Sequence, residues 1–250
     1  MEQAGAITWL GHSTVLVEID GARIVTDPLL RERVLHLRRL HPAPDPAPAG
    51  ESDAILVSHL HPDHLDRRSL RLLPADIPLI GPAGTRRTLR FSRREVVEVR
   101  AGEATQVGPL RVRAVPAAHD PRRHPLARAG EALGFVIEGT RSVYFAGDTE
   151  LFEEMSQIGP VDVALLPVWG WGPRAATGHL DPEQAVEALR RIRPRLCVPI
   201  HWGTLVPLHL QRKRPRWLTD PPHELLRLAA QEAPEVEVRI LEPLERLPIA

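Results

Sequence analysis

Four side chains that commonly bind metals stand within six positions of one another, directly after the apolar run at residues 54–57. They are His59, His61, Asp63 and His64. In an extended chain alternate residues point to the same side, so the first three are expected to converge, with His64 beside them where the chain turns. Such a cluster rarely arises by chance after a buried strand, and its groups are ligands that zinc accepts. The segment therefore predicts a strand whose end carries enough ligands for two metal ions.

Three more potential ligands stand just after apolar runs that are expected to be strands: His119 after residues 110–115, Asp148 after residues 142–146, and His201 after residues 196–200. Any one of them alone is more often a turn or cap residue. Ligands that emerge from the ends of several strands, however, form a site on a rigid scaffold. Their shared placement, taken with the cluster at residues 59–64, predicts one common site.

Short β-branched runs between turn signals dominate the chain. The expected strands are residues 15–19, 23–26, 54–57, 96–99, 110–115, 134–138, 142–146, 163–167, 196–200 and 236–241. Asp20-Gly21 suits a type I′ turn between the first two. Helical periodicity appears at residues 64–72, 84–90, 182–192 and 222–231. The third of these has a clear start, with Asp181 as the cap, Pro182 in the first turn and Gln184 at the capping-box position.

Residues 41–50 are too rich in proline for a helix or a central strand. They follow a basic, partly amphipathic stretch at residues 29–40. Two interpretations remain open for this region: a surface loop with a short helix, or a lid over the site.

The composition narrows the classes of function. Formal net charge is +0, whereas proteins that grip nucleic acid usually show a basic excess, so no nucleic-acid partner is expected. No apolar run approaches the about 18 residues that a membrane span needs. The single cysteine, Cys197, permits no internal disulfide, and the first residues lack the pattern of a secretory signal. A cytoplasmic location is expected.

Five segments together resemble the metallo-β-lactamase-fold hydrolases. They are TWLGHSTVLVEIDGARIVTDPLL at 8–30, SHLHPDHLD at 58–66, FAGDT at 145–149, GHLDPEQAVEAL at 178–189 and PIHWGT at 199–204. Within that superfamily the chain is similar to the branch of N-acyl-phosphatidylethanolamine phospholipase D and the ascorbate-6-phosphate lactonases. The resemblance implies an α+β fold, a four-layer αββα sandwich. We expect one domain over residues 1–250, with two similar halves at roughly 1–135 and 136–250.

The resemblance also implies roles for the ligands. The first metal would be held by His59, His61 and His119, the second by Asp63, His64 and His201, and Asp148 and a hydroxide would bridge them. We expect two divalent ions, zinc first, with manganese, iron and nickel as alternatives. Asp63 would also orient the attacking hydroxide. His179 would face the substrate and protonate a leaving group or bind an oxyanion, unless it is only a loop histidine.

Several residues around these ligands allow two interpretations. Asp27 and Asp66 lie where carboxylates would hold imidazole N–H groups, although both also suit turns or a helix surface. Trp169 and Trp171 would line the mouth of the substrate pocket or simply pack. His12 could back the site, but we expect a structural role for it. Two basic clusters, at residues 122–124 and 212–216, suit solvated faces better than an anion site, given the neutral overall charge.

The expected function is hydrolysis of a small-molecule ester, a phosphodiester or a lactone, with a slight preference for the phosphodiester. Three alternatives stay open: an iron-dependent oxidoreductase on the same fold, an RNA-processing nuclease, and a non-catalytic metal-dependent scaffold. Iron-dependent oxygen uptake would favour the first, and RNA binding with a steep salt dependence the second. The sequence does not specify an oligomeric state.

Overall fold

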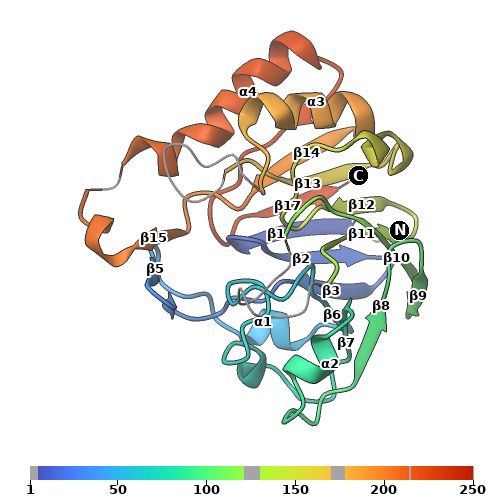
Figure 1. Cartoon of the computed structure of the whole chain (residues 1–250). Helices are drawn as coiled ribbons and strands as arrows, with labels where there is room; N and C mark the ends of the chain where they lie inside the picture. Colours follow the sequence, from blue (N-terminus) through green and yellow to red (C-terminus); the bar gives the residue numbers. More distant parts are fainter. Residues whose placement is uncertain (1–4, 121–129, 170–177, 214, 250) are drawn as a thin grey trace.

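Two seven-stranded sheets form the centre of the protein (Figure 1). The computed structural model describes residues 5–120, 130–169, 178–213 and 215–249. The first sheet runs, in spatial order, through β17 (Arg246–Ile249), β1 (Gly5–Gly11), β2 (Thr14–Ile19), β3 (Ala22–Thr26), β6 (Ala54–Leu56), β7 (Leu79–Pro82) and β8 (Val96–Val99). The second runs through β16 (Glu237–Val238), β14 (Leu196–Ile200), β13 (Val163–Pro167), β12 (Ser142–Phe145), β11 (Leu133–Glu138), β10 (Leu110–Pro116) and β9 (Ala104–Val107).

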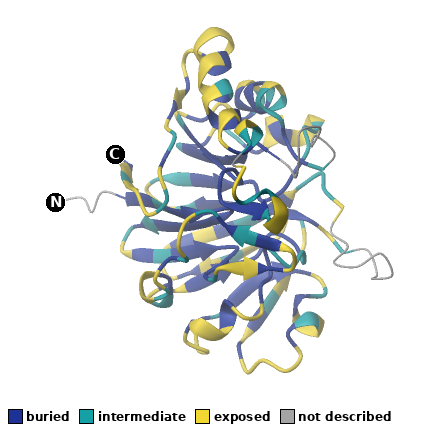
Figure 2. Ribbon diagram, turned by 90° about the vertical axis from the view of Figure 1, so that its left-hand side faces the viewer, coloured by how far each residue is buried: buried dark blue, intermediate teal, exposed yellow. Residues whose placement is uncertain are grey.

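The two sheets pack face to face over a shared hydrophobic core. Alternate residues of a strand point to opposite faces, and β2 shows the consequence. Val15 and Val17 belong to the core between the sheets, whereas Leu16 packs on the outer face of the first sheet. Strands buried on both faces read as continuous apolar runs, which is why they are conspicuous in the sequence. Figure 2 shows the buried strands as a dark centre with the exposed residues around it.

Helices cover the outer faces of both sheets, which gives the expected α+β, four-layer αββα sandwich. The second sheet carries α3 (Pro182–Ile192) and α4 (Asp220–Glu232), seen side by side in Figure 1. The outer layer of the first sheet is thinner and consists of α1 (Ala47–Gly50), α2 (Thr85–Thr88) and the 3-10 turn η1 (Leu70–Leu72). Three further 3-10 turns are η2 (Glu153–Gln157), η3 (Leu208–Leu210) and η4 (Arg216–Leu218). No helix among the described residues is long and apolar enough to span a membrane.

Three of the four predicted helices are confirmed: α3 and α4 nearly in full, and α2 as a single turn within residues 84–90. α3 has the predicted capping box, in which the Asp181 carboxylate accepts from the Gln184 N–H at 2.8 Å. The helix predicted at residues 64–72 is wrong, since only η1 forms there. The Asp66 carboxylate accepts from both the N–H and the hydroxyl of Ser69, and such side-chain bonds compete with helix formation. Residues 41–50 end in the single turn α1, in which proline occupies the tolerated first positions.

The predicted strands correspond to strands of the structure, although only Glu237–Val238 forms within residues 236–241. Asp20 and Gly21 both have positive φ, 52° and 80°, as the type I′ hairpin requires. The short helix considered for the region at residues 29–50 forms as α1, whereas residues 29–40 contain no helix. This stretch forms a hairpin of β4 (Arg33–Val34) and β5 (Leu37–Arg39), and β5 pairs with β15 (Leu205–Pro207) in a small third sheet.

Candidate metal centre

The predicted ligands gather at one edge of the two facing sheets. Each stands just beyond a strand end: His59 to His64 after β6, His119 after β10, Asp148 after β12 and His201 after β14. The carboxyl ends of parallel strands meet at the same edge of a sheet, so the topology itself brings these segments together. The structure unites all seven predicted ligands and adds His12 and His179 to them.

Asp148 lies at the middle of the cluster, with its side chain 2% exposed. One or the other of its carboxylate oxygens faces the Nε2 atoms of five imidazoles, at 3.1 Å for His64, 3.1 Å for His179, 3.2 Å for His201, 3.7 Å for His59 and 3.9 Å for His119. This central position is the one that a bridging carboxylate between two metal ions requires.

One group of ligand atoms comprises His59, His61, His119 and Asp148, all within 4.8 Å of one another. Two of its imidazoles are oriented by contacts at Nδ1, the ring nitrogen that faces away from the site. His59 Nδ1 lies 3.0 Å from the Ser58 hydroxyl, and His119 Nδ1 donates to the Gly178 carbonyl at 2.6 Å. Both contacts turn the Nε2 atoms toward Asp148, the orientation that metal ligands need.

Gly178 has to be glycine for His119 to keep this position. Its φ is +88°, a left-handed conformation that side chains rarely adopt. A Cβ atom there would also lie 3.0 Å from His119 Nδ1, closer than ordinary contact. The sequence pattern Gly178-His179 thus combines a tight backbone approach with a histidine in the site.

A second group comprises His12, Asp63, His64 and His201, again within 4.8 Å of one another. His64 Nδ1 donates to Asp27 Oδ2 at 2.6 Å, and His201 Nδ1 donates to the Trp169 carbonyl at 2.8 Å. These bonds fix the tautomers and leave both Nε2 atoms turned toward the carboxylates. The two groups, joined at Asp148, can therefore supply ligands for two cations.

Burial and charge set the protonation of the cluster. Burial lowers the pKa of His59 and of His201 well below 6.5, so both are neutral, the form that binds metals. Burial raises the pKa of Asp148, but His201, His64 and His179 outweigh it and hold that pKa well below its usual range. The site therefore combines neutral imidazoles with an ionised carboxylate.

His64 shows how strongly this position attracts positive charge. Burial alone would lower its pKa, but Asp148, Asp27 and Asp63 outweigh burial and raise it well above 6.5. Three carboxylates around one imidazole provide the negative charge that a divalent cation would neutralise.

A buried nitrogen without a hydrogen-bond partner is a further sign that the cluster fits a metal ion. His59 Nε2 is buried and has no hydrogen-bond partner among the described residues. Buried polar atoms nearly always have a partner, and an ion is one explanation for an exception. A set of imidazole nitrogens and carboxylate oxygens suits zinc, and also manganese, iron or nickel.

Asp27 and Asp66 turn out to differ completely. Asp27 contacts His64 and also accepts from the Ser58 N–H at 2.8 Å and the Ser58 hydroxyl at 2.6 Å, as predicted for a carboxylate behind the ligands. The corresponding expectation for Asp66 is wrong, because its carboxylate binds Arg31 and Ser69 and holds no imidazole.

The predicted substrate residues fall in different places. Trp169 is 7% exposed and stacks on Trp217 with ring centres 5.2 Å apart, which favours the packing interpretation. Trp171 lies outside the described residues, as does the basic cluster at 122–124. Arg212 and Lys213 of the other basic cluster are exposed beyond η3, away from the ligands.

His12 reaches into the site itself. Its Nε2 atom lies 3.3 Å from Asp63 Oδ2, so it stands behind the site as one interpretation had it, and the structural role stays a prediction. The available signal was its place at the end of residues 5–11, an apolar run that was not recognised as the strand β1. Like the other ligands, it follows a strand.

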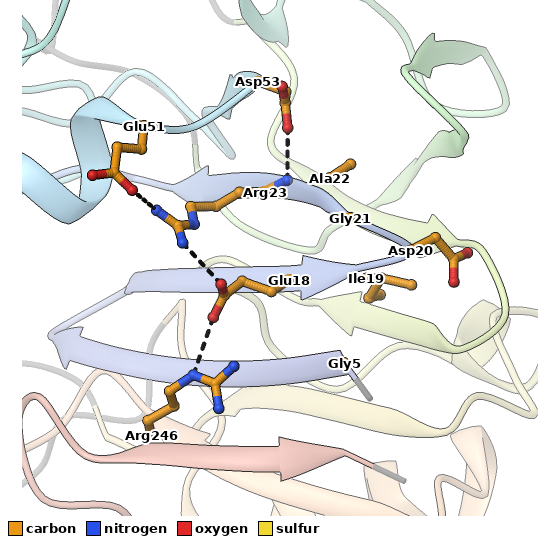
Figure 3. Close-up of a pocket in the computed structure, with 10 residues that line it drawn as sticks. All are labelled: Gly5, Glu18, Ile19, Asp20, Gly21, Ala22, Arg23, Glu51, Asp53 and Arg246. Carbon is orange, nitrogen blue, oxygen red and sulfur yellow. Dashed lines mark hydrogen bonds and ion pairs between the residues drawn. The ribbon is translucent and has the colours of Figure 1, made fainter. Parts of the chain in front are cut away.

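A surface hollow of about 530 Å³ lies at the opposite ends of β1, β2 and β3, far along the strands from this edge. Four of its charged groups pair with one another, since Glu18 contacts both Arg23 and Arg246, and Arg23 also contacts Glu51 (Figure 3). The two remaining carboxylates accept hydrogen bonds, Asp20 from Thr140 and Asp53 from the Arg23 N–H, and the hollow contains none of the candidate metal-ligand groups found among the described residues.

Comparison with known proteins agrees with this geometry. A family model, the beta-lactamase superfamily domain, matches residues 22–202. A UPF0173 metal-dependent hydrolase of Methanopyrus kandleri is 32% identical over 96% of this chain and 97% of its own length. The N-acyl-phosphatidylethanolamine-hydrolyzing phospholipase D 1 of Caenorhabditis elegans is 31% identical over 79% of this chain and 63% of its own. Igni18, a metallo hydrolase of Ignicoccus hospitalis with a solved structure, aligns with a TM-score of 0.74 and 25% identity over 99% of both chains.

The chain belongs to the β-lactamase superfamily and has the metallo-β-lactamase fold, as its sequence resemblance predicted. Within that superfamily it belongs to a family of metal-dependent hydrolases. The similarity to the phospholipase D, likewise predicted, is also confirmed.

Proposed function

We propose that this protein hydrolyses a phosphodiester or a lactone with two divalent metal ions, and that a phosphodiester is the better candidate. The observation that carries the proposal is the pair of neighbouring ligand groups, one of which contains Asp148 while the other has His64 and His201 within 3.2 Å of that carboxylate. His59, His61 and His119 would hold one ion, and Asp63, His64 and His201 the other, with zinc as the first choice of metal. Two such ions polarise the bond under attack, lower the pKa of a bound water and stabilise the attacking and leaving oxygens.

We assign Asp63 the role of orienting the attacking water. Burial raises the pKa of its carboxyl, but His64 and His12 outweigh burial and hold the pKa well below its usual range, so Asp63 is ionised and accepts hydrogen bonds. Its side chain is 14% exposed, more than that of Asp148, and so it is the carboxylate of the pair that solvent reaches more readily. We infer that Asp63 accepts a hydrogen bond from the attacking water and orients it, while the metal ions would make that water acidic.

His179 is placed to donate a proton. It stands just before α3, with its Nε2 atom 3.1 Å from Asp148 Oδ2 and its side chain 8% exposed. It belongs to neither of the two ligand groups that contain His59 or Asp63. We infer that its imidazole protonates the leaving oxygen or binds the developing negative charge.

Support for the phosphodiester comes from the similarity to the phospholipase D, whose name describes hydrolysis of a phosphodiester in a lipid. The net charge of +0 supports a small-molecule substrate over a nucleic acid, because nucleic-acid binding usually needs a basic surface. The proposal therefore names a small ester substrate and no nucleic-acid partner.

The direct test is turnover of bis(p-nitrophenyl) phosphate and of a simple lactone by protein reconstituted with zinc or manganese. Asp63→Ala serves as the variant that lacks the carboxylate proposed to orient the water and to hold the second ion. Phosphodiester turnover that is lost in Asp63→Ala would support the proposal. Metal-dependent turnover of the lactone alone would move the assignment to the lactone. Turnover of neither by protein that binds two ions would refute the proposed hydrolysis of these esters.

A further inference from the structure

His12 lies among the proposed ligands of the second ion and has the geometry of a ligand itself. Its Nε2 atom is 3.3 Å from Asp63 Oδ2. Its ring centre lies 4.2 Å from that of His201 and 5.0 Å from that of His64. The ligand atoms of all four residues fall within 4.8 Å of one another. A cation held by Asp63, His64 and His201 would therefore have the His12 nitrogen within the same small space.

The backbone at His12 is held in an unusual conformation. Its φ is 55°, in the left-handed region that residues other than glycine and asparagine rarely adopt. Three hydrogen bonds secure it: its N–H donates to the Thr204 hydroxyl at 2.6 Å, and its carbonyl accepts from Trp9 Nε1 at 2.9 Å and from the His201 N–H at 3.0 Å. Backbone strain that is fixed so thoroughly is typical of functional sites.

The bond from the His201 N–H has a further consequence. It joins the backbone of His12 directly to that of a proposed ligand, and Thr204, three residues after His201, secures the other side of His12. The two imidazoles are therefore positioned as one unit.

We propose that His12 is a further ligand of the second metal position, together with Asp63, His64 and His201. This inference rests on the dinuclear centre of the proposed function. With His12, the second position has three imidazoles and a carboxylate in addition to the shared Asp148. A nitrogen-rich set of this kind selects zinc, iron, cobalt or nickel over magnesium and manganese.

His12→Asn is the sharpest test, because asparagine tolerates the left-handed backbone and keeps its hydrogen bonds. Its side chain is too short to reach the position of the imidazole Nε2. Metal-free protein would be titrated with Zn²⁺ against a competing chelator, and with Co²⁺ while its visible absorption is recorded. We expect two ions per wild-type chain, and in the variant one ion of unchanged affinity and a second bound about 10-fold or more weaker, on the scale known for changes around metal sites.

His36→Asn is the matched control, since it makes the same change at an exposed histidine outside the ligand groups. Circular dichroism and thermal unfolding of the metal-free proteins would establish that each variant is folded. If His12→Asn fails to fold, His12→Gly, which also tolerates the left-handed backbone and carries no ligand atom, takes its place with the same expected loss.

The outcomes separate this inference from the function on which it rests. Two ions bound by His12→Asn with wild-type affinity would show that His12 only hydrogen-bonds to Asp63, and would overturn the inference while the dinuclear centre stands. Fewer than two ions in the wild-type chain would overturn both.

Discussion

Asp27→Asn should weaken metal binding without unfolding the protein, and the structure explains why. Asp27 Oδ2 accepts from His64 Nδ1 at 2.6 Å, so the second ring nitrogen, Nε2, which is turned toward Asp148, is the one that would lose its proton to a metal ion. An asparagine amide in the same place would donate to His64 Nδ1. The ring proton would then move to Nε2, where it blocks the nitrogen that is proposed to bind the ion.

The expected magnitude follows from these contacts. Residues that orient metal ligands contribute about 10–100-fold to metal affinity, which corresponds to about 1.4–2.8 kcal/mol. Asparagine has nearly the shape of aspartate and can still accept from the Ser58 N–H, which now lies 2.8 Å from Asp27 Oδ1. The free energy of unfolding of the metal-free protein should therefore fall by only about 1–3 kcal/mol, the cost of one impaired buried hydrogen bond.

Chelator competition with Zn²⁺ measures the affinity, and urea denaturation of metal-free protein measures the stability. Asp66→Asn is the matched control: its carboxylate is also buried and stands two residues from His64, but it binds Arg31 and Ser69. It should leave metal affinity unchanged. The reasoning fails if Asp27→Asn binds both ions as tightly as the wild type, or if Asp66→Asn weakens binding equally.

Three other predictions concern the same cluster. Asp148→Ala should lower metal content and abolish hydrolysis while circular dichroism still shows a folded sandwich, and full activity in this variant would contradict a shared carboxylate. His179→Ala should lower turnover while two ions remain bound, as metal analysis and kcat would show, and unchanged turnover would make it a loop residue. The metal-free protein should become less stable as the pH falls from about 7.5 to about 5.5. Five imidazoles have lowered pKa values in the folded protein, so below pH 6.5 the unfolded chain binds protons that the folded protein does not bind. They are His12, His59, His61, His119 and His201. His64, with its raised pKa, acts in the opposite sense, so a melting temperature that rises on acidification would show that it dominates.

The ligands could be predicted from the sequence because their signal is local. Each stands just after an apolar run, and four of them share one short segment. The fold was accessible for a related reason, since strands buried on both faces leave continuous β-branched runs that end in turn signals. The capped helix at Pro182–Ile192 could also be predicted, because the residues that start it are neighbours in the sequence.

What the sequence could not supply depends on contacts between distant segments. Asp27 acts on His64 from 37 positions away, whereas Asp66 stands two positions from it and faces Arg31 instead. His12 has its partner at Asp63, across the sheet from its own hairpin. The small sheet of β4, β5 and β15 likewise forms only because residues 205–207 return to the hairpin at residues 33–39.

The central claim is that this edge of the sandwich holds two metal ions that share Asp148. Anomalous X-ray scattering from crystals of zinc-loaded protein tests it most directly, because the signal above the zinc absorption edge locates each ion independently of the protein atoms. The account predicts two peaks on either side of the Asp148 carboxylate, one against His59, His61 and His119 and the other against Asp63, His64 and His201. A single peak, or peaks away from these residues, would contradict it.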